Sequence, residues 1–436
     1  MTASPHLVTR PSGPLRGTLS VPGDKSITHR AIILSALADG EAVIGDYCRG
    51  EDCLNTVSVL QALGIPIDVA RKTLKISGKG LWGLREPDRI LDCGNSGTGI
   101  RLLAGLLAGQ SFFSVLTGDA SIRKRPMGRV VGPLRQMGAT IAGRCGGELA
   151  PLAITGSRLS GIAYRSSIAS AQVKSSLLFA GLFAEGTTSV TEPALSRDHT
   201  ERMFAFFGIP IVRQELTVTI TGRTSLGAKD VRIPGDLSAA AFFLVAASIV
   251  PGSDVTVIGV GINPTRTGIL DILHDMGAQI DVLNRREQAG EPVCDLRARA
   301  SELHGITINA ERVLKAIDEI PILSVAAASA KGDTTFTGAA ELRVKESDRL
   351  ATMACELGRM GVKVEERPDG LKIRGGLSLK GAVCQSYGDH RVAMSMAVAG
   401  LIAEGETQVH DSACVATSFP DFDKYLRRLL TPSGQG

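Results

Sequence analysis

Six stretches of the chain share one pattern of apolar and polar positions. Each is an apolar, alanine-rich run of helical length, followed by a glycine, a short alternating run and a polar segment. This pattern predicts a helix and then a strand in every copy. The glycines between helix and strand stand at intervals of 69, 77, 66, 80 and 73 residues; they are Gly40, Gly109, Gly186, Gly252, Gly332 and Gly405.

A second helix end, again followed by a glycine and a β-type run, trails the first in five copies. The runs LGIPIDV, MGATI, FGIPIV, MGAQIDV and MGVKVEE mark it, at Gly64, Gly138, Gly208, Gly277 and Gly361. A glycine just past the last helical turn takes the left-handed conformation that ends a helix at little cost. Two such ends per copy predict a repeated β-α-β-α-β-β unit of roughly 70 residues. Ordinary α/β proteins also contain helix-glycine-strand steps, but regular spacing over six copies favours the repeat.

The sixth copy lacks a second helix end of this kind. We therefore expect the N-terminal run LRGTLSVPG, residues 15–23, to complete the sheet of the sixth unit. The fold class is then α/β (α+β), with two domains of three units each. The predicted domains are residues 25–234, and residues 1–24 plus 235–436, the latter closed by the N-terminal strand.

Composition and net charge exclude several kinds of binding partner for this protein. The chain has 44% hydrophobic and 21% charged residues, and 48 basic against 44 acidic side chains give a net charge of +4. Because this charge is nearly balanced, we expect no nucleic-acid or membrane partner. The longest apolar run, 239–250, is too short to span a bilayer, and the N-terminus shows no signal core. With eight cysteines and no C-x-x-C pair, the sequence favours a cytoplasmic protein.

Polar clusters precede the alanine-rich helices, at 23–30, 94–101, 170–174, 234–236, 318–319 and 388–391. Helix N-termini present N–H groups and a positive dipole end, which attract anions. A lone Ser or Asp at such a position is usually only a cap. Glycines with Lys or Arg at several equivalent positions instead predict binding of phosphorylated or carboxylated small molecules.

Charged loops follow the β-type runs at the same phase of successive units, at 123–126, 196–199 and 343–349. A charged loop is commonly a solvated face, but a shared phase favours a common site. If the helix starts of both domains face one another, they line a substrate cleft between the domains. Asp318 and Glu346 are then candidate acid–base groups among its cations.

The sequence does not match the common motifs for nucleotide or zinc binding. Gly94 and Gly99 have the spacing of a Walker A loop, but Ile100 and Arg101 replace the Lys and Ser/Thr that such a loop needs. No G-x-G-x-x-G follows a strand with an acidic residue about 20 positions later. The seven histidines show no zinc spacing. We therefore expect no cofactor and no metal.

Nine runs, in this order along the chain, resemble the family of 3-phosphoshikimate 1-carboxyvinyltransferase, also called 5-enolpyruvylshikimate-3-phosphate synthase. They are PGDKSITHR, GNSGTGIR, KRPMGR, SAQVKS, IPGDLSAAAFF, IDEIP, RVKESDR, GDHRVAMS and TSFPDF. The resemblance covers essentially the whole chain. It implies a monomer with the enolpyruvyl transferase fold, in which the three units of each domain surround a pseudo-threefold axis. It also implies transfer of the enolpyruvyl group of phosphoenolpyruvate to the 5-hydroxyl of 3-phosphoshikimate by addition and elimination, with release of phosphate.

Roles for individual residues are carried over from the same resemblance. Asp318 matches the base near the 5-hydroxyl, Glu346 the group that exchanges a proton with the methylene carbon, and Lys25 the lysine that assists the departing phosphate. The residues implied for 3-phosphoshikimate are Lys25, Ser26, Arg30, Ser170, Ala171, Gln172, Arg197, Asp318 and Lys345. Those implied for phosphoenolpyruvate are Lys25, Gly97, Arg125, Gln172, Arg349 and Arg391.

Two positions depart from the pattern of many family members. Thr417 stands where many carry Lys, and Ala171 where many carry Ser. Neither is a proposed acid–base residue, and both departures are typical of a bacterial, glyphosate-insensitive-type subgroup. We interpret them as variation rather than loss of activity.

Two alternatives to the activity implied by the resemblance remain. One is the sister enolpyruvyl transferase that acts on UDP-N-acetylglucosamine, but the segment 118–128 lacks the cysteine that this sister enzyme uses. The other is an inactive polyanion-binding homologue, against which the retention of Lys25, Asp318 and Glu346 argues.

Overall fold

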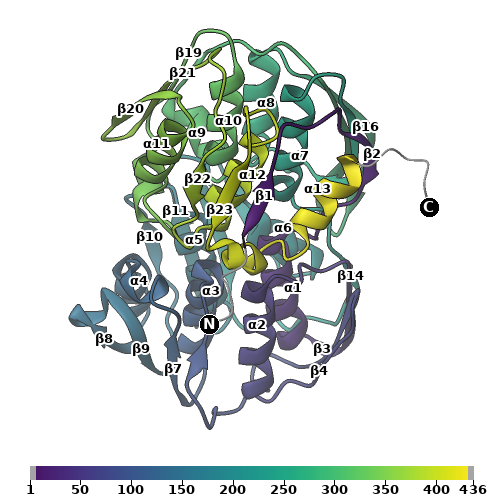
Figure 1. Ribbon diagram of the computed structural model, residues 1–436. Coiled ribbons are helices and arrows are strands. Elements are labelled where there is room, and N and C mark those ends of the chain that lie inside the picture. The colour runs from purple at the N-terminus through teal and green to yellow at the C-terminus, as the bar shows by residue number, and fades with distance from the viewer. Residues whose placement is uncertain (1–5, 431–436) are drawn as a thin grey trace. The chain divides into compact units, whose positions relative to one another are not determined.

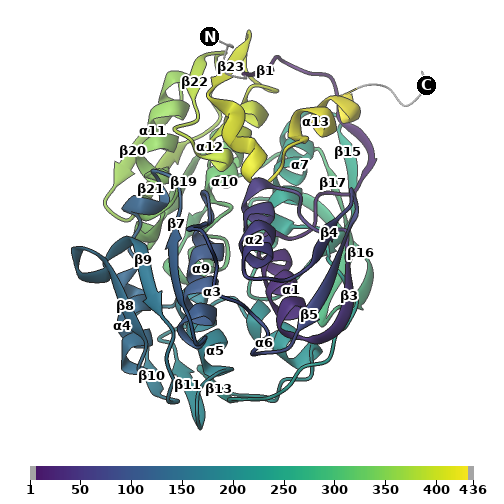
Figure 2. The ribbon, with the colours of Figure 1, turned by 90° about the horizontal axis from the view of Figure 1, so that it is seen from below.

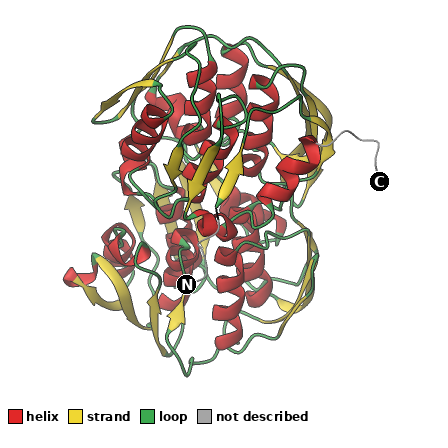
Figure 3. Cartoon of the chain, viewed as in Figure 1, coloured by secondary structure: helices red, strands yellow, loops and turns green. Residues whose placement is uncertain are grey.

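The structure is a computed structural model that describes residues 6–430 (Figure 1 and Figure 3). Its residues group into two compact units. Unit 1 comprises the chain up to Pro22, Pro234–Glu287 and the chain from Pro292 onward; unit 2 comprises Gly23–Ile233 and Gln288–Glu291. Each unit has its own hydrophobic core, so the two are described separately.

Unit 2 lies entirely within the described residues and holds three copies of the predicted unit. The first is α1 (Lys25–Leu37), β3 (Asp39–Gly45), α2 (Glu51–Ala62), β4 (Ile67–Val69) and β5 (Thr73–Lys79), with β14 (Val231–Arg232) in its sheet. The second is β6 (Leu91–Asp92), α3 (Gly97–Ala108), β7 (Phe113–Thr117), η1 (Ile122–Lys124), α4 (Gly128–Gln136), β8 (Thr140–Arg144), η2 (Cys145–Gly147) and β9 (Leu149–Thr155). The third is β10 (Ala163–Arg165), α5 (Ala171–Gly181), β11 (Thr187–Thr191), α6 (His199–Phe206), β12 (Ile211–Gln214) and β13 (Thr217–Thr221).

Unit 1 holds the other copies. The fourth is α7 (Leu237–Ile249), β15 (Asp254–Gly261), α8 (Gly268–Asp275), β16 (Gln279–Gln288) and β17 (Glu291–Arg299), with β2 (Arg16–Leu19) in its sheet. The fifth is β18 (Thr307–Ile308), α9 (Ala310–Lys315), α10 (Ile320–Ser329), β19 (Asp333–Phe336), η3 (Ala340–Val344), α11 (Arg349–Arg359), β20 (Lys363–Arg367) and β21 (Gly370–Arg374). The sixth is β22 (Val383–Gln385), α12 (His390–Ala399), β23 (Thr407–His410), η4 (Ser412–Thr417) and α13 (Phe422–Leu430), with β1 (Leu7–Thr9) in its sheet.

The four-stranded sheets share one strand order. In the second copy it is β6-β7-β9-β8: β7 runs parallel to β6, with Leu116 opposite Leu91, and antiparallel to β9, with Val115 opposite Ala153. The same order recurs as β10-β11-β13-β12 and as β18-β19-β21-β20. The recurrence confirms the repeated β-α-β-α-β-β unit that the hydrophobic pattern predicts.

Two strands join sheets other than that of the helix that follows them in the chain. β14 precedes α7 but pairs in parallel with β3 of the first copy, and β2 precedes α1 but pairs in parallel with β15 of the fourth. The prediction that residues 15–23 complete the sixth sheet was therefore wrong. The N-terminal strand of that sheet is β1, antiparallel to β23. The reason is strand direction: the sixth sheet already has β22 parallel to β23, whereas β15 needs β2 as its parallel neighbour.

The glycines of the second helix ends behave as predicted. Gly64, Gly138, Gly208, Gly277 and Gly361 all have φ between 85° and 100°. At Gly64 the amide donates to Gln61 O at 3.0 Å and the next amide, Ile65, donates to Leu60 O at 3.1 Å, which is a Schellman motif. A side chain at such a position costs roughly 1–2 kcal/mol.

The first set of glycines differs. Five have positive φ but lie three to six residues beyond the last helical residue. Gly109 instead caps α3 with a φ of −91°, so the left-handed prediction was wrong there. Close packing requires a glycine here, because a Cβ at Gly109 would lie 2.4 Å from the Cβ of Phe183.

The alanine-rich helices form the centre of each unit. In unit 2, α3 packs against α1 and lies beside α5 (Figure 2); in unit 1, α7, α10 and α12 pack against one another. Within α7 only Ala239 and Ile249 are not fully buried. A helix buried on all sides has no polar face, which is why α7 and α10 carry no charged residue. No described helix is long and apolar enough to cross a membrane.

The central helices begin at the predicted polar clusters. Asp24, Ser96, Ser170, Asp236 and Asp389 are the N-caps of α1, α3, α5, α7 and α12, and each side chain accepts a backbone N–H of the first turn. Glu319 precedes α10 without such a bond. The fold therefore places charged side chains at helix starts in both units.

Candidate active site

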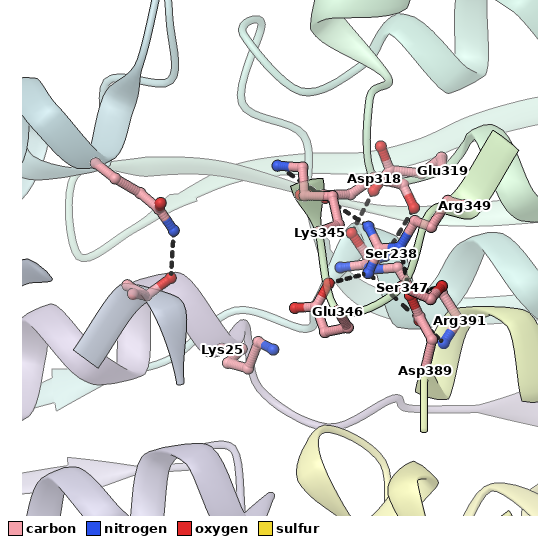
Figure 4. Close-up of polar contacts among 12 residues, drawn as sticks. Lys25, Ser238, Asp318, Glu319, Lys345, Glu346, Ser347, Arg349, Asp389 and Arg391 are labelled. Atoms are coloured by element: carbon pink, nitrogen blue, oxygen red, sulfur yellow. Dashed lines mark hydrogen bonds and ion pairs between the residues drawn. The ribbon is translucent and has the colours of Figure 1, made fainter. Parts of the chain in front are cut away.

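Arg349 joins three carboxylates at the start of α11. Its Nε lies 2.8 Å from Asp389 Oδ2, its Nη1 lies 3.2 Å from Asp318 Oδ1, and its Nη2 lies 2.6 Å from Glu346 Oε2 (Figure 4). The Arg349 side chain is 1% exposed. Both predicted acid–base residues, Asp318 and Glu346, thus share one buried guanidinium.

The charge of Arg349 is stabilised by these neighbours. Burial alone would lower the pKa of Arg349, but the carboxylates of Asp389, Glu346 and Asp318 outweigh burial and raise the pKa above its ordinary value. Lys345 adds a second cation, with Nζ 3.9 Å from Asp318 Oδ1. A planar guanidinium can meet several carboxylates at once, which a lysine ammonium on a flexible stem does less well.

Asp389 organises the start of α12. Its Oδ1 accepts the backbone N–H of Arg391 at 2.9 Å, and its Oδ2 accepts the hydroxyl of Ser347 at 3.2 Å. Arg391 Nη1 in turn donates to the carbonyl oxygen of Asp318 at 3.0 Å. The sequence pattern predicts an anion-binding helix start at 388–391, and it does not reveal Asp389 as the partner of Arg349. An aspartate at an N-cap was the available signal, but a cap that also binds a guanidinium is not visible in spacing.

A second buried network starts at Glu319, next to Asp318. The Ser238 hydroxyl donates to Glu319 Oε1, and Arg266 Nη2 donates to Ser238 Oγ at 2.5 Å and to Asp236 Oδ1 at 3.3 Å. These contacts tie the start of α10 to the start of α7. No motif in the sequence pointed to Arg266, which lies between β15 and α8.

In unit 2, Lys25 is the first residue of α1. Its Nζ lies 2.9 Å from Asp52 Oδ2 in the first turn of α2, and the two side chains are 15% and 5% exposed. Asp24 accepts the Ile27 N–H at 2.9 Å and so caps the helix that carries Lys25. The ammonium is therefore positioned by two helices.

Arg30 lies one turn further along α1 and is buried. Its Nε donates to Thr200 Oγ1 at 2.7 Å, Nη1 to the Ser26 carbonyl at 2.8 Å, and Nη2 to Ser175 Oγ at 2.8 Å. Burial, with a smaller effect from the charge of Arg197, lowers the pKa of Arg30 to about 10, against the raising effect of Glu201, Asp24 and Glu291. Arg30 is therefore a buried cation held between hydroxyl groups and carboxylates of its own unit.

His29, on α1, links this helix to α2 and to the N-cap of α3. Its Nδ1 lies 2.8 Å from Thr56 Oγ1 on α2, and its Nε2 lies 3.2 Å from Ser96 Oγ, the N-cap of α3. Burial, with the charges of Lys25 and Arg30, lowers the pKa of His29 to about 3. His29 is thus a neutral imidazole that joins the starts of α1 and α3.

Gly97 opens α3 beneath two guanidinium groups. A Cβ built on Gly97 would lie 2.7 Å from Arg125 Nη1 and 2.9 Å from Arg101 Nη1. Arg101 donates to the carbonyl oxygens of Gly97 and Pro126, each at 2.9 Å. Only a glycine leaves Arg125 this close to the start of α3.

Three further predicted residues lie at the start of α5, Arg197 lies in the loop between β11 and α6, and Thr417 is the last residue of η4. Ser170 caps α5, Ala171 is its first residue, and Gln172 Nε2 donates to Thr98 Oγ1 at 3.3 Å. Thr417 donates to the Cys414 carbonyl at 2.7 Å and lies 3.3 Å from His390 Nδ1. Thr417 therefore lies beside the start of α12, the helix that also carries Arg391.

Lys174 corrects part of the sequence analysis. It belongs to the 170–174 cluster interpreted as an anion site, but its Nζ lies 2.7 Å from Glu192 and 2.7 Å from Glu201 and is buried. Its charge is balanced within the protein. Within residues 6–430, His, Cys, Asp and Glu side chains form no group of three suited to a metal ion.

The fold and these helix starts define a class of protein. Repeated β-α-β-α-β-β units in two compact units, with charged residues at the starts of the central helices, are the architecture of the enolpyruvyl transferases. A solved structure of EPSP synthase from Acinetobacter baumannii matches with a TM-score of 0.87 and 44% identity, covering 97% of this chain and 98% of that chain.

Sequence comparisons identify the family. The model of EPSP synthase (3-phosphoshikimate 1-carboxyvinyltransferase) matches residues 9–426. The 3-phosphoshikimate 1-carboxyvinyltransferase of Citrifermentans bemidjiense is 55% identical over 98% of this chain and 99% of its own length. That of Desulforamulus reducens is 53% identical over 98% and 99%. The chain belongs to the EPSP synthase family, which confirms the resemblance found in the sequence.

Proposed function

We propose that this protein transfers the enolpyruvyl group of phosphoenolpyruvate to the 5-hydroxyl of 3-phosphoshikimate and releases phosphate. The observation that carries the proposal is the family match over residues 9–426. The joint placement of Asp318 and Glu346 on Arg349 supports it, because the reaction needs two acid–base groups. The product is 5-O-(1-carboxyvinyl)-3-phosphoshikimate, a step in the shikimate pathway to chorismate and the aromatic amino acids.

The proposed chemistry has an addition and an elimination. Glu346 delivers a proton to the methylene carbon of phosphoenolpyruvate, and the 5-hydroxyl adds to C2 while its proton passes to Asp318. Phosphate then leaves from C2, assisted by Lys25, as a methyl proton returns to Glu346. The ion pair with Arg349 favours a charged Asp318, which is the form a general base needs, whereas Glu346 must leave its own ion pair with Arg349 to hold the proton that it delivers.

Cations are proposed to hold the acceptor substrate. Arg30 and Arg197 would bind its anionic groups, as the family resemblance implies for both residues. Nη1 and Nη2 of Arg30 each carry two N–H groups. The hydrogen bonds to Ser26 and Ser175 use one N–H group of each nitrogen, so each nitrogen keeps a second N–H group for the substrate. The other residues proposed for 3-phosphoshikimate are Lys25, Ser26, Ser170, Ala171, Gln172, Asp318 and Lys345.

A second set of residues is proposed to bind phosphoenolpyruvate. Gly97 supplies backbone at the start of α3, where Arg125 lies close. Arg349 would bind phosphoenolpyruvate through the guanidinium nitrogen Nη2, which contacts Glu346 in the structure, so the substrate would replace part of that ion pair. Arg391, Lys25 and Gln172 complete the set.

The protein is further proposed to act as a cytoplasmic monomer that binds neither membrane nor nucleic acid. Its nearly balanced charge of +4 supports the absence of a membrane or nucleic-acid partner, and the monomeric state is implied by the family resemblance.

Phosphate release tests the proposed function. The assay supplies phosphoenolpyruvate with either 3-phosphoshikimate or UDP-N-acetylglucosamine as acceptor. We expect release with 3-phosphoshikimate only. Release with UDP-N-acetylglucosamine alone would assign the sister activity, and release with neither would leave an inactive homologue.

A further inference from the structure

Tyr387 adopts an unusual backbone conformation immediately before the site. It lies between β22 and α12 with a φ of 56°, and Gly388 follows with a φ of 71°. A bulky residue in the left-handed region costs roughly 1–2 kcal/mol. Within residues 6–430, Tyr387 is the only non-glycine residue with positive φ in a loop that leads into a central helix. The next residues are Gly388 and Asp389, the partner of Arg349.

One buried carboxylate holds both sides of this turn. Glu356 Oε1 accepts the Tyr387 hydroxyl at 2.7 Å, and Glu356 Oε2 accepts the backbone N–H of Gln385 at 3.0 Å. Glu356 is fully buried, whereas Tyr387 is 44% exposed. Arg359, with Nε 3.3 Å from Oε1, balances the charge of Glu356. The hydrogen bond to Glu356 raises the pKa of Tyr387, so its hydroxyl remains a donor at neutral pH.

Helix α11 contacts the turn at two places. Glu356 follows Arg349 by seven residues, which is two helical turns, so both side chains lie on one face of α11. Arg349 contacts Asp389, and Glu356 contacts Tyr387 and Gln385. The strained turn is therefore fixed against the same helix that carries Arg349. A turn fixed in this way sets where α12 begins, and hence where Arg391 stands.

We propose that Tyr387 and Glu356 are positioning residues for the binding of phosphoenolpyruvate. They hold the turn at 385–388 so that Asp389 orients Arg349 and the start of α12 presents Arg391. Neither residue is assigned a contact with substrate. The inference rests on the proposed roles of Arg349 and Arg391 in donor binding.

Steady-state kinetics of four variants test this inference. Tyr387→Phe removes the hydroxyl, and Tyr387→Asn keeps a residue that tolerates the left-handed region but cannot reach Glu356. We expect each to raise the KM for phosphoenolpyruvate about three- to tenfold, the scale of one lost hydrogen bond, with the KM for 3-phosphoshikimate unchanged. Tyr47→Phe is the matched control, because the Tyr47 hydroxyl donates to the Ala70 carbonyl at 2.9 Å in unit 2. It should alter thermal stability only.

Arg391→Ala separates the positioning role of Tyr387 and Glu356 from the proposed role of Arg391 in donor binding. If it raises the KM for phosphoenolpyruvate while both Tyr387 variants leave that constant unchanged, the positioning inference is overturned. If Tyr387→Phe and Tyr47→Phe change both KM values and thermal stability alike, the hydroxyl is merely structural and the inference is again overturned. An unchanged donor KM in Arg391→Ala would overturn the proposed role of Arg391, and the inference with it.

Discussion

Arg349 Nε and Asp389 Oδ2 lie 2.8 Å apart, and the two side chains are 1% and 0% exposed. The pair joins the start of α11 to the N-cap of α12. Because both charges are buried, loss of Arg349 leaves Asp389 without the guanidinium that it pairs with, and breaking a buried pair in this way typically costs about 3–5 kcal/mol. The pair therefore serves the stability of unit 1 as well as the geometry of the site.

Arg349→Lys should lower both the catalytic rate and the stability of unit 1. A lysine cannot contact Asp318, Glu346 and Asp389 together, so we expect kcat to fall at least roughly 100-fold and the free energy of unfolding to fall by about 3 kcal/mol. Steady-state kinetics and urea unfolding measure the two effects. Arg367→Lys, at an exposed pair with Glu365, is the control and should change neither. Wild-type kcat in Arg349→Lys would contradict the proposed arrangement.

Glu346→Gln and Asp318→Asn should stop the chemistry while sparing acceptor binding. Loss of one acid–base group lowers kcat by roughly 10²- to 10⁴-fold. Titration calorimetry with 3-phosphoshikimate should still show binding to Glu346→Gln. Glu365→Gln, on an exposed strand, is a matched control that should keep wild-type kcat. A fully active Glu346→Gln would remove the proton-transfer assignment.

Gly97→Ala tests the packing at the start of α3. Its Cβ would lie 2.7 Å from Arg125 Nη1, so the guanidinium must move. We expect the KM for phosphoenolpyruvate to rise about tenfold or more, with little change in the KM for 3-phosphoshikimate. Gly132→Ala, within α4 where a Cβ meets nothing within 4 Å, should leave kinetics unchanged. Equal donor KM values in the two variants would contradict the placement of Arg125.

His29 should make unfolding pH-dependent. The folded state holds the pKa of His29 at about 3, below the ordinary value of 6.5, so the unfolded state binds the proton first as pH falls. The stability contribution of this group is complete above pH 6.5 and declines from there toward pH 3, by up to about 1.4 kcal/mol per pH unit. Urea unfolding at pH 7.5, 6 and 5 should show a shallower decline in His29→Asn than in the wild type. His274→Asn, at an exposed site, should keep the wild-type slope.

Local signals predicted much of the fold. The glycines at Gly64 and Gly277 end helices through contacts within a few residues, so spacing alone identifies them. The caps at Asp24 and Asp236 are likewise local. Strand pairing is not local: β2 and β15 are more than 200 residues apart, and nothing in the run 15–23 distinguishes the fourth sheet from the sixth.

Some residues of the candidate active site were predicted from the sequence, and others became apparent only in the structure. Asp318, Glu346 and Arg349 were found through family runs, and the structure brings them together. Asp389 and Glu356 were missed, because their importance lies in which guanidinium or hydroxyl they contact. Such contacts depend on tertiary packing, which spacing in the sequence does not report.

The most direct test follows the product in D₂O by NMR, with phosphoenolpyruvate and 3-phosphoshikimate as substrates. Addition places one solvent deuteron on the methylene carbon, and elimination then removes one of three methyl hydrogens. We expect 5-O-(1-carboxyvinyl)-3-phosphoshikimate with deuterium in its vinyl group, formed together with phosphate. Absence of this product, or a product whose vinyl group carries no solvent deuterium, would contradict the proposed addition and elimination.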